Sequence, residues 1–303
     1  MELYTRILLP KARFSFSYED RVVMMGSCFA ENIGRKLEEN KFSVDINPFG
    51  TLYNPASVAE GLRMLLRPEY FTPGDLFQHE GIYHSFTHHS RFSAPSEEEC
   101  LGHINSRLSE SSDFLRKATR LVITLGTAFV YRLKSDGRIV SNCHKLPEKM
   151  FDRQRLSTQE IVEDWKPLLL ALWEQNPALK ILFTVSPIRH WKDGAHENQL
   201  SKATLLLATD AFRPGKIIPA ESPTSPLMRS LWTSSGIIVS MRTICSIPPH
   251  WPLIIFGNVL SKISYPQTLR QSLKNGVIFK KLLTISPFNR IARPISGLSF
   301  KLC

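Results

Sequence analysis

The segment Gly26-Ser27-Cys28 has the clearest potential for chemistry, because it stands between an apolar run and a helical pattern. A short turn from a buried strand into a helix exposes a serine hydroxyl and points the amides of the helix N-terminus toward a developing oxyanion. This arrangement is typical of a nucleophilic serine. Ser27 also suits a helix N-cap, which favours serine for structural reasons alone. The residue pattern leaves both interpretations open.

Several other side chains could take part in the same chemistry. Cys28 is a rival nucleophile, although the residue after the serine is also expected to pack inward as a small hydrophobic group. His144 and His190 are candidate bases, and each is equally a candidate substrate contact or structural hydrogen-bonding group. Arg189, beside His190, fits either an anionic substrate group or a salt bridge.

Buried strands and helices alternate over the first 210 residues, and these elements would position the reactive groups. The strands are apolar throughout, which predicts a mainly parallel α/β sheet covered on both faces. The turns Gly26-Ser27, Gly126-Thr127 and Ser186-Pro187 each follow such a strand, so they are expected to meet at one edge of the sheet. We expect strands at 21–25, 42–46, 121–125 and 180–185, a hairpin across 129–141, and helices at 29–40, 56–66, 159–175 and 197–209.

Residues 67–112 are polar and irregular, and four histidines cluster within residues 79–89. No carboxylate or cysteine stands at ligand spacing beside them, so a solvated insertion is expected rather than a metal site. The five cysteines are scattered and odd in number, which predicts neither a disulfide framework nor a zinc site. We therefore expect no metal and no cofactor. The four histidines are His79, His84, His88 and His89.

Four ordered blocks resemble the GSCFA family, beginning with G-S-C-F-A at residues 26–30. The others are N-P-F-G-T-L-Y-N-P at 47–55, S-N-C-H-K at 141–145, and S-P-I-R-H at 186–190 followed by N-Q-L-S-K-A at 198–203. The resemblance covers residues 1 to about 208. The family is similar to the SGNH/GDSL serine hydrolases, a relation that implies a three-layer α/β/α, flavodoxin-like fold. It also implies an ester or acyl substrate, either a small molecule or a glycan ester.

The relation to SGNH hydrolases also implies roles for single residues. Ser27 would be the nucleophile, and the amides of Gly50 and Gly126 would form the oxyanion hole. The third block departs from the hydrolase pattern G-x-N-D, because here it reads G-T-A-F at residues 126–129. Losing one oxyanion donor typically costs about a hundredfold or more in rate, and Asn142 is a candidate substitute. The candidate substrate-binding residues are Asn54, Asn142, His144, Arg189 and His190.

The last part of the chain has a different character. Residues 211–303 contain twelve basic residues and one acid, a net of +11, so residues 1–210 are neutral overall. SGNH hydrolases supply their base and its orienting carboxylate from an Asp-x-x-His near the C-terminus, and GSCFA proteins have a similar D-M-x-H-P-S. Residues 209–303 contain no Asp-x-x-His. The chain as given is therefore expected to be inactive or nearly so.

A one-base frameshift near residues 209–222 would explain this tail. Reading permitted codons for residues 232–251 one base upstream gives M-D-E-L-R-D-Y-R-F-Y-A-D-D-M-F-H-P-S-A-L, which contains the missing motif. We therefore expect a GSCFA domain at 1–208 with its last strand and helix disrupted, and an aberrant, out-of-frame basic tail at 209–303. On this hypothesis the positive charge of the tail does not indicate nucleic-acid binding. The competing interpretation is a basic tail that binds polyanions.

Composition narrows the remaining expectations. No apolar run is long enough to span a bilayer, and the charged N-terminal segment does not resemble a signal peptide, so a cytoplasmic protein is expected. We expect no nucleic-acid or membrane partner, and the oligomeric state is not readable. The alternative to a hydrolase is a non-catalytic module that binds a glycan or acyl ligand.

Overall fold

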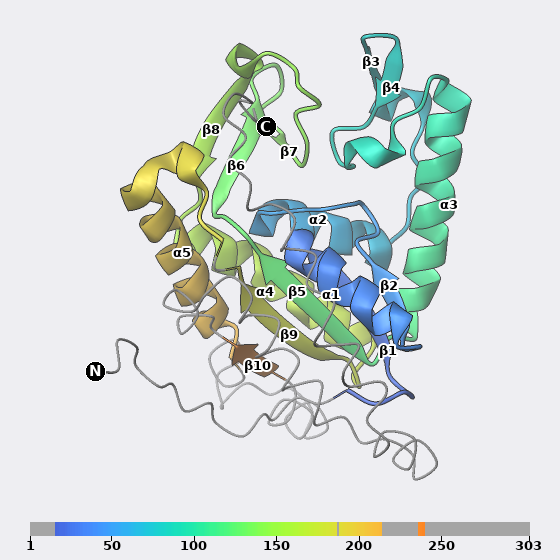
Figure 1. Ribbon diagram of the computed structural model, residues 1–303, viewed down its shortest axis with the longest axis vertical. Coiled ribbons are helices and arrows are strands. Elements are labelled where there is room, and N and C mark those ends of the chain that lie inside the picture. The colour runs from blue at the N-terminus through green and yellow to red at the C-terminus, as the bar shows by residue number, and fades with distance from the viewer. Residues whose placement is uncertain (1–15, 187, 214–235, 240–303) are drawn as a thin grey trace, which may run out of the picture.

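A parallel sheet of five strands forms the centre of the fold (Figure 1). The computed structural model describes residues 16–186, 188–213 and 236–239 of the 303-residue chain. The strand order is β10-β9-β5-β1-β2, and every pairing is parallel. The strands are β1 (Arg21–Gly26), β2 (Ser43–Ile46), β5 (Arg120–Leu125), β9 (Lys180–Val185) and β10 (Gly236–Val239).

Helices cover both faces of this sheet, which gives the three-layer α/β/α arrangement predicted from the sequence and the resemblance. Successive residues of β1 point to opposite faces: Val22 and Met24 pack with α1, whereas Val23 and Met25 pack with the other helices. All four are fully buried, as expected for a strand covered on both sides. The helices are α1 (Cys28–Glu39), α2 (Pro55–Leu66), α3 (Glu97–Arg116), α4 (Thr158–Gln175) and α5 (Gly194–Ala211).

The order of the strands reverses between β1 and β5. From β1 the chain first passes to β2 at one side, and then crosses to β5 on the other side of β1 and continues outward to β9. In open parallel sheets, ligands bind outside the carboxyl ends of the strands at such a switch point. Ser27 directly follows β1, and Gly126 directly follows β5. The topology therefore places the candidate nucleophile where a ligand is expected.

Two excursions rise from the carboxyl-end side of the sheet (Figure 1). One follows α2 and contains a small antiparallel pair of strands, and the other is an antiparallel three-stranded sheet that follows β5. They meet through backbone hydrogen bonds from Ser141 and Asn142 to the Phe86 carbonyl, at 2.8 and 3.2 Å. The short elements are η1 (Pro73–Asp75), β3 (Phe77–His79), β4 (Ile82–His84), η2 (Ser90–Phe92), β6 (Phe129–Leu133), β7 (Ile139–Val140), η3 (Glu148–Met150), β8 (Phe151–Arg155) and η4 (Trp191–Asp193).

The predicted strands, the hairpin and the four predicted helices are confirmed to within a few residues. The prediction of an irregular segment over 67–112 is wrong for its second half, where α3 forms a helix of 20 residues. Ser96 caps this helix by accepting a hydrogen bond from the Glu99 amide, and three glutamates occupy its first turn. Its buried face includes Ser111 and Ser112, which weakened the apolar periodicity. Strand β8 was also not predicted.

The packed domain extends slightly beyond the predicted boundary at residue 208. Helix α5 ends at Ala211, and the Phe212 ring packs against Trp165 and Phe183 at centroid distances of 5.8 and 5.0 Å. Strand β10 comes from the segment predicted to be out of frame, and it pairs with β9. The rest of that segment lies outside the described residues. No helix in the described ranges is both long and apolar enough to cross a membrane.

Candidate functional site

Ser27 is fixed at the junction between β1 and α1 by the neighbouring strand. Its N–H donates to the Thr124 carbonyl at 3.0 Å, in continuation of the β1–β5 pairing. Gly26 precedes it with φ of +129°, and a Cβ there would stand 2.2 Å from the Thr124 carbonyl oxygen. Only glycine fits this backbone and this close approach. The turn that presents Ser27 therefore depends on the glycine of the first block.

The Ser27 hydroxyl acts as the N-cap of α1. Its Oγ accepts a hydrogen bond from the Phe29 amide at 3.3 Å, which in the described part of the chain is its one hydrogen bond. The residue is only 2 % exposed, and it directly follows the carboxyl end of β1. The N-cap interpretation is thus confirmed. The nucleophile interpretation stays a prediction, because within the described residues the Ser27 hydroxyl is not hydrogen-bonded to a base.

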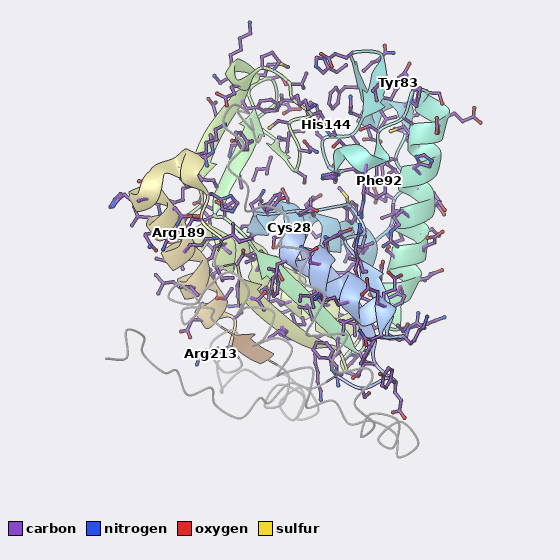
Figure 2. All side chains as sticks on the ribbon, in the orientation of Figure 1. Cys28, Tyr83, Phe92, His144, Arg189 and Arg213 are labelled. Carbon is purple, nitrogen blue, oxygen red and sulfur yellow. The ribbon has the colours of Figure 1, made fainter. Side chains whose placement is uncertain are left out.

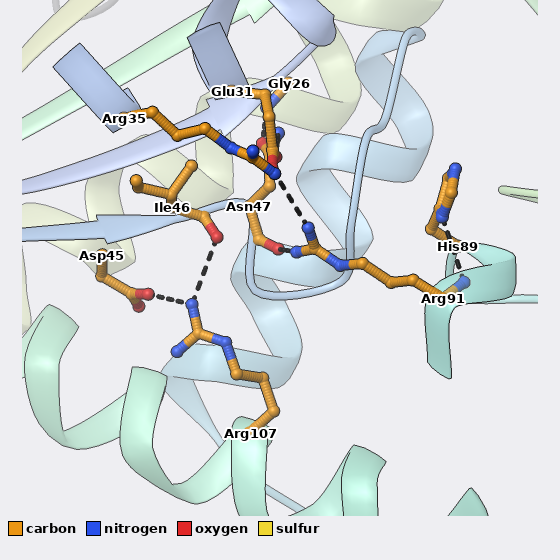
Figure 3. Close-up of polar contacts among 9 residues, drawn as sticks. All are labelled: Gly26, Glu31, Arg35, Asp45, Ile46, Asn47, His89, Arg91 and Arg107. Atoms are coloured by element: carbon orange, nitrogen blue, oxygen red, sulfur yellow. Dashed lines mark hydrogen bonds and ion pairs between the residues drawn. The ribbon is translucent and has the colours of Figure 1, made fainter. Parts of the chain in front are cut away.

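Asn47 holds the turn from below through its side-chain amide (Figure 3). Its Oδ1 accepts from the Gly26 N–H, and its Nδ2 donates to a Glu31 oxygen, both at 2.9 Å. The Asn47 carbonyl accepts from the Arg91 guanidinium at 2.5 Å, and the backbone is left-handed with φ of +44°. Burial raises the pKa of the Glu31 carboxyl, but the Asn47 hydrogen bond and the Arg35 and Arg91 cations outweigh it, so the pKa lies below its ordinary value.

The loop after Asn47 joins the ends of β1 and β5. The Leu52 N–H donates to the Gly26 carbonyl at 2.9 Å, and the Tyr53 carbonyl accepts from the Gly126 N–H at 2.7 Å. The Gly50 N–H donates to the Asn47 carbonyl at 2.8 Å. The amides of Gly50 and Gly126 are therefore both engaged within the chain. Their predicted oxyanion role requires these hydrogen bonds to be shared or exchanged when a ligand binds.

Helix α5 closes the other side of the β5 turn. Ala128, at the position of the missing asparagine, is fully buried, and its N–H donates to the Ser201 hydroxyl at 2.8 Å. Asn198 accepts from the His190 N–H at 3.0 Å, which fixes the loop after β9. The Lys202 ammonium donates to the Gly126 carbonyl. The turn at Ser186 lies at the same edge, because the Ser186 N–H donates to the Leu125 carbonyl at the end of β5, at 2.8 Å.

His190 is half-buried beside Gly126, and its ring makes an edge contact with Tyr53 at a centroid distance of 6.1 Å. Burial lowers the pKa of His190, and the Lys202 charge lowers it further, with Asp193 opposing. Burial raises the pKa of the half-buried Cys28 thiol, which favours the neutral form. His190 thus favours its neutral, proton-accepting form.

The structure does not bring the other candidates to Ser27. Figure 2 shows His144 between the two excursions, whereas Cys28 lies at the N-terminal end of α1. His144 Nε2 bonds the Ser85 carbonyl at 2.8 Å, and Asn142 Oδ1 accepts from the His144 N–H at 2.9 Å. The Asn54 side chain caps α2 by bonding the amide and hydroxyl of Ser57. Arg189 is exposed on the loop after β9.

Two of the clustered histidines, His84 and His88, form a buried group with His144 where the excursions meet. The rings of His84 and His144 lie 4.5 Å apart, and His88 bonds the Ser85 hydroxyl at 3.1 Å. Burial lowers the pKa of His88 to about 3 and that of His144 to about 4, so both are neutral near pH 7. Within the described residues, no group of three or more histidine, cysteine or acidic side chains is placed to hold a metal ion.

Sequence reasoning missed Asn47, Tyr53 and Lys202. All three lie inside blocks that carried the resemblance, but neither composition nor periodicity assigned them a role. The spacing of Asn198 and Lys202, four residues apart, was the available signal, since it places both side chains on one face of a helix.

Comparisons with known proteins identify a family for this chain. Neither a curated protein nor a solved structure matched the chain. The model of the GSCFA family matches residues 21–217, about two thirds of the 303 residues, and this range includes every site residue described above. The chain therefore belongs to the GSCFA family.

Proposed function

We propose that this chain is a domain of the serine ester or acyl hydrolase type that binds its ligand at the ends of β1 and β5 and has little or no turnover as given. The carrying observation is the position of Ser27. Ser27 directly follows the carboxyl end of β1, at the switch point of the sheet, and precedes the first residue of α1. The loops that contain Gly50 and Gly126 lie beside it.

The expectation of low turnover rests on the proton acceptor. A serine nucleophile needs a base that removes its proton and usually a carboxylate that orients the base. In the described residues the Ser27 hydroxyl bonds the Phe29 amide alone. Residues 209–303 contain no Asp-x-x-His.

Hydrolysis of p-nitrophenyl acetate tests the proposal. The chain and its Ser27→Ala variant are expected to release p-nitrophenol at the same slow rate. Ser27-dependent hydrolysis by the chain as given would refute the expectation of low turnover. We further propose that the segment beginning near residues 209–222 is read out of frame, so that a frame-restored chain should gain Ser27-dependent hydrolysis. Resequencing the gene tests the frameshift directly. If the codons of the tail are confirmed and the shifted frame does not encode the family motif, the frameshift hypothesis is refuted.

A non-catalytic module that binds a glycan or acyl ligand is the second candidate. Two observations favour it: the amides of Gly50 and Gly126 are both engaged, and Ala128 stands in place of the third-block asparagine. A frame-restored chain that binds an ester analogue, for example a phosphonate, but releases no product over hours would support this function. Measurable turnover by the restored chain would exclude it.

A further inference from the structure

The turn after β5 lacks a polar side chain where hydrolases of this type place their oxyanion asparagine. Ala128 points into the core, and its amide is bound to Ser201. The Thr127 hydroxyl is also used, since it pairs with Ser201 at 3.1 Å. A negatively charged ligand oxygen at this turn would therefore need a donor from another element.

Helix α5 presents such a group at the same turn. Asn198, Ser201 and Lys202 are spaced so that they share one helix face, and each bonds the site loops: Asn198 the His190 amide, Ser201 the Ala128 amide, and Lys202 the Gly126 carbonyl. Two of these contacts involve backbone groups at the β5 end, so the Lys202 ammonium is held in a defined place.

This place is close to Ser27. The parallel register pairs Gly26 with Thr124, so Ser27 stands level with Leu125 and one residue before Gly126 on the adjacent strand. Adjacent strands are about 4.8 Å apart. The Lys202 charge also reaches His190, whose pKa it helps to lower after burial. A cation and a neutral imidazole thus flank the strand end next to the serine.

We propose that Lys202 binds the negatively charged oxygen of a carboxylate ligand at the ends of β1 and β5, in place of the asparagine that the third block lacks. The ligand class is a monocarboxylate, the acid product of the ester or acyl hydrolysis proposed above, and the inference rests on that function for the identity of the ligand. Lys202 acts through its charge, and the α5 contacts position it.

Acetate binding, followed through the ring signals of His190 by NMR, tests this proposal. Acetate replaces chloride at constant ionic strength, and the pKa of His190 is read at each step. A carboxylate bound at Lys202 should raise the pKa of His190 by about half a unit, because a nearby negative charge favours the imidazolium. In Lys202→Met the pKa of His190 should start higher, since a lowering charge is gone, and the apparent acetate Kd should rise at least about tenfold.

Two further variants serve as controls. Lys192→Met removes a lysine two residues after His190 that bonds Glu148 at 2.6 Å, and this variant should bind acetate as the unaltered chain does. Lys202→Arg keeps the charge and should retain binding, which separates loss of charge from loss of fold. An unaltered chain without an acetate-specific shift, or an equal shift in Lys202→Met, would overturn the proposal.

Comparing the acetate titration with the ester hydrolysis assay keeps this inference apart from the hydrolase proposal. Acetate binding that depends on Lys202 in a chain whose restored form never hydrolyses esters would leave the Lys202 site standing and remove the hydrolase function. Ser27-dependent hydrolysis without any acetate response would support the hydrolase function and remove the Lys202 site.

Discussion

Replacing Asn47 is the sharpest test of how the Ser27 turn is built. The side chain supplies the acceptor for the Gly26 N–H and a donor to Glu31, and the backbone is left-handed at φ of +44°. Asparagine tolerates this conformation better than most residues. Asn47→Ala removes both hydrogen bonds and keeps a Cβ on a left-handed backbone. Asn47→Gly removes the same hydrogen bonds but relieves the backbone.

The expected magnitudes follow from burial. Asn47 is fully buried, so the Gly26 N–H loses an acceptor that water does not replace, which costs about 1 to 3 kcal/mol. The left-handed alanine adds about 1 kcal/mol. We therefore expect Asn47→Ala to lower the free energy of unfolding by about 2 to 4 kcal/mol, and Asn47→Gly by about 1 kcal/mol less.

Urea unfolding followed by far-UV circular dichroism measures both values on the full chain. Asn47→Asp is the matched charge variant: it keeps the Oδ1 acceptor but sets a carboxylate against Glu31. At pH 7, Asn47→Asp should lower the free energy of unfolding by more than the loss of one hydrogen-bond donor would. This decrease should shrink as the pH falls and the two carboxylates are protonated. Losses below about 0.5 kcal/mol in both Asn47→Ala and Asn47→Gly would refute the claim that Asn47 holds the turn.

Three further predictions concern the same framework. Gly26→Ala should abolish folding or lower the melting temperature by many degrees, because its Cβ would stand 2.2 Å from the Thr124 oxygen; soluble yield and thermal melting check this. His88 has a folded-state pKa of about 3, below an unfolded value near 6.5, so its contribution to stability is complete above pH 6.5 and declines as the pH falls below it. His88→Phe should therefore flatten the loss of stability between pH 6.5 and 4.5 by on the order of 2 kcal/mol, and an unchanged pH slope would count against this. Arg107→Leu strands the Asp45 carboxylate, which is 4 % exposed and bonded to Arg107 (Figure 3), and should cost about 3 to 5 kcal/mol. Adding Asp45→Asn should recover part of that cost in urea unfolding, and a double variant no more stable than Arg107→Leu would contradict the pairing.

Most of the central sheet could be predicted because its strands are short apolar runs that end in glycine or serine. The meeting of Ser27 and Gly126 at one edge of the sheet was also predictable, since the carboxyl ends of parallel strands lie at the same edge. Helix α3 could not be recognised from periodicity, because its buried face uses Ser111 and Ser112. The Ser112 hydroxyl bonds the Leu65 carbonyl at 2.8 Å, so a polar residue there is satisfied by a partner far away in the sequence.

The sequence predicted the strand-to-helix turn of the site, but not which side chains from distant segments lie beside it. Gly26 and Ser27 were identified because their types fit a strand-to-helix turn. Asn142 and His144 were grouped with them by the blocks, yet the structure ties both to Ser85 and Phe86 on the first excursion. Such contacts are set by where two long excursions meet, and short sequence spacing does not encode that.

Strand β10 cannot serve as the anchor of the missing acid–base pair in a restored frame. In the shifted reading, codons 236–239 specify R-D-Y-R in place of G-I-I-V, so the apolar strand that pairs with β9 belongs to the present frame alone. The strand ends that hold Ser27 and Gly126, and the part of α5 that contains Lys202, are all encoded before residue 209, so their sequence is the same in both readings. On the frameshift hypothesis, one lost reading frame would therefore remove the proton acceptor and leave the strand ends around Ser27 in place.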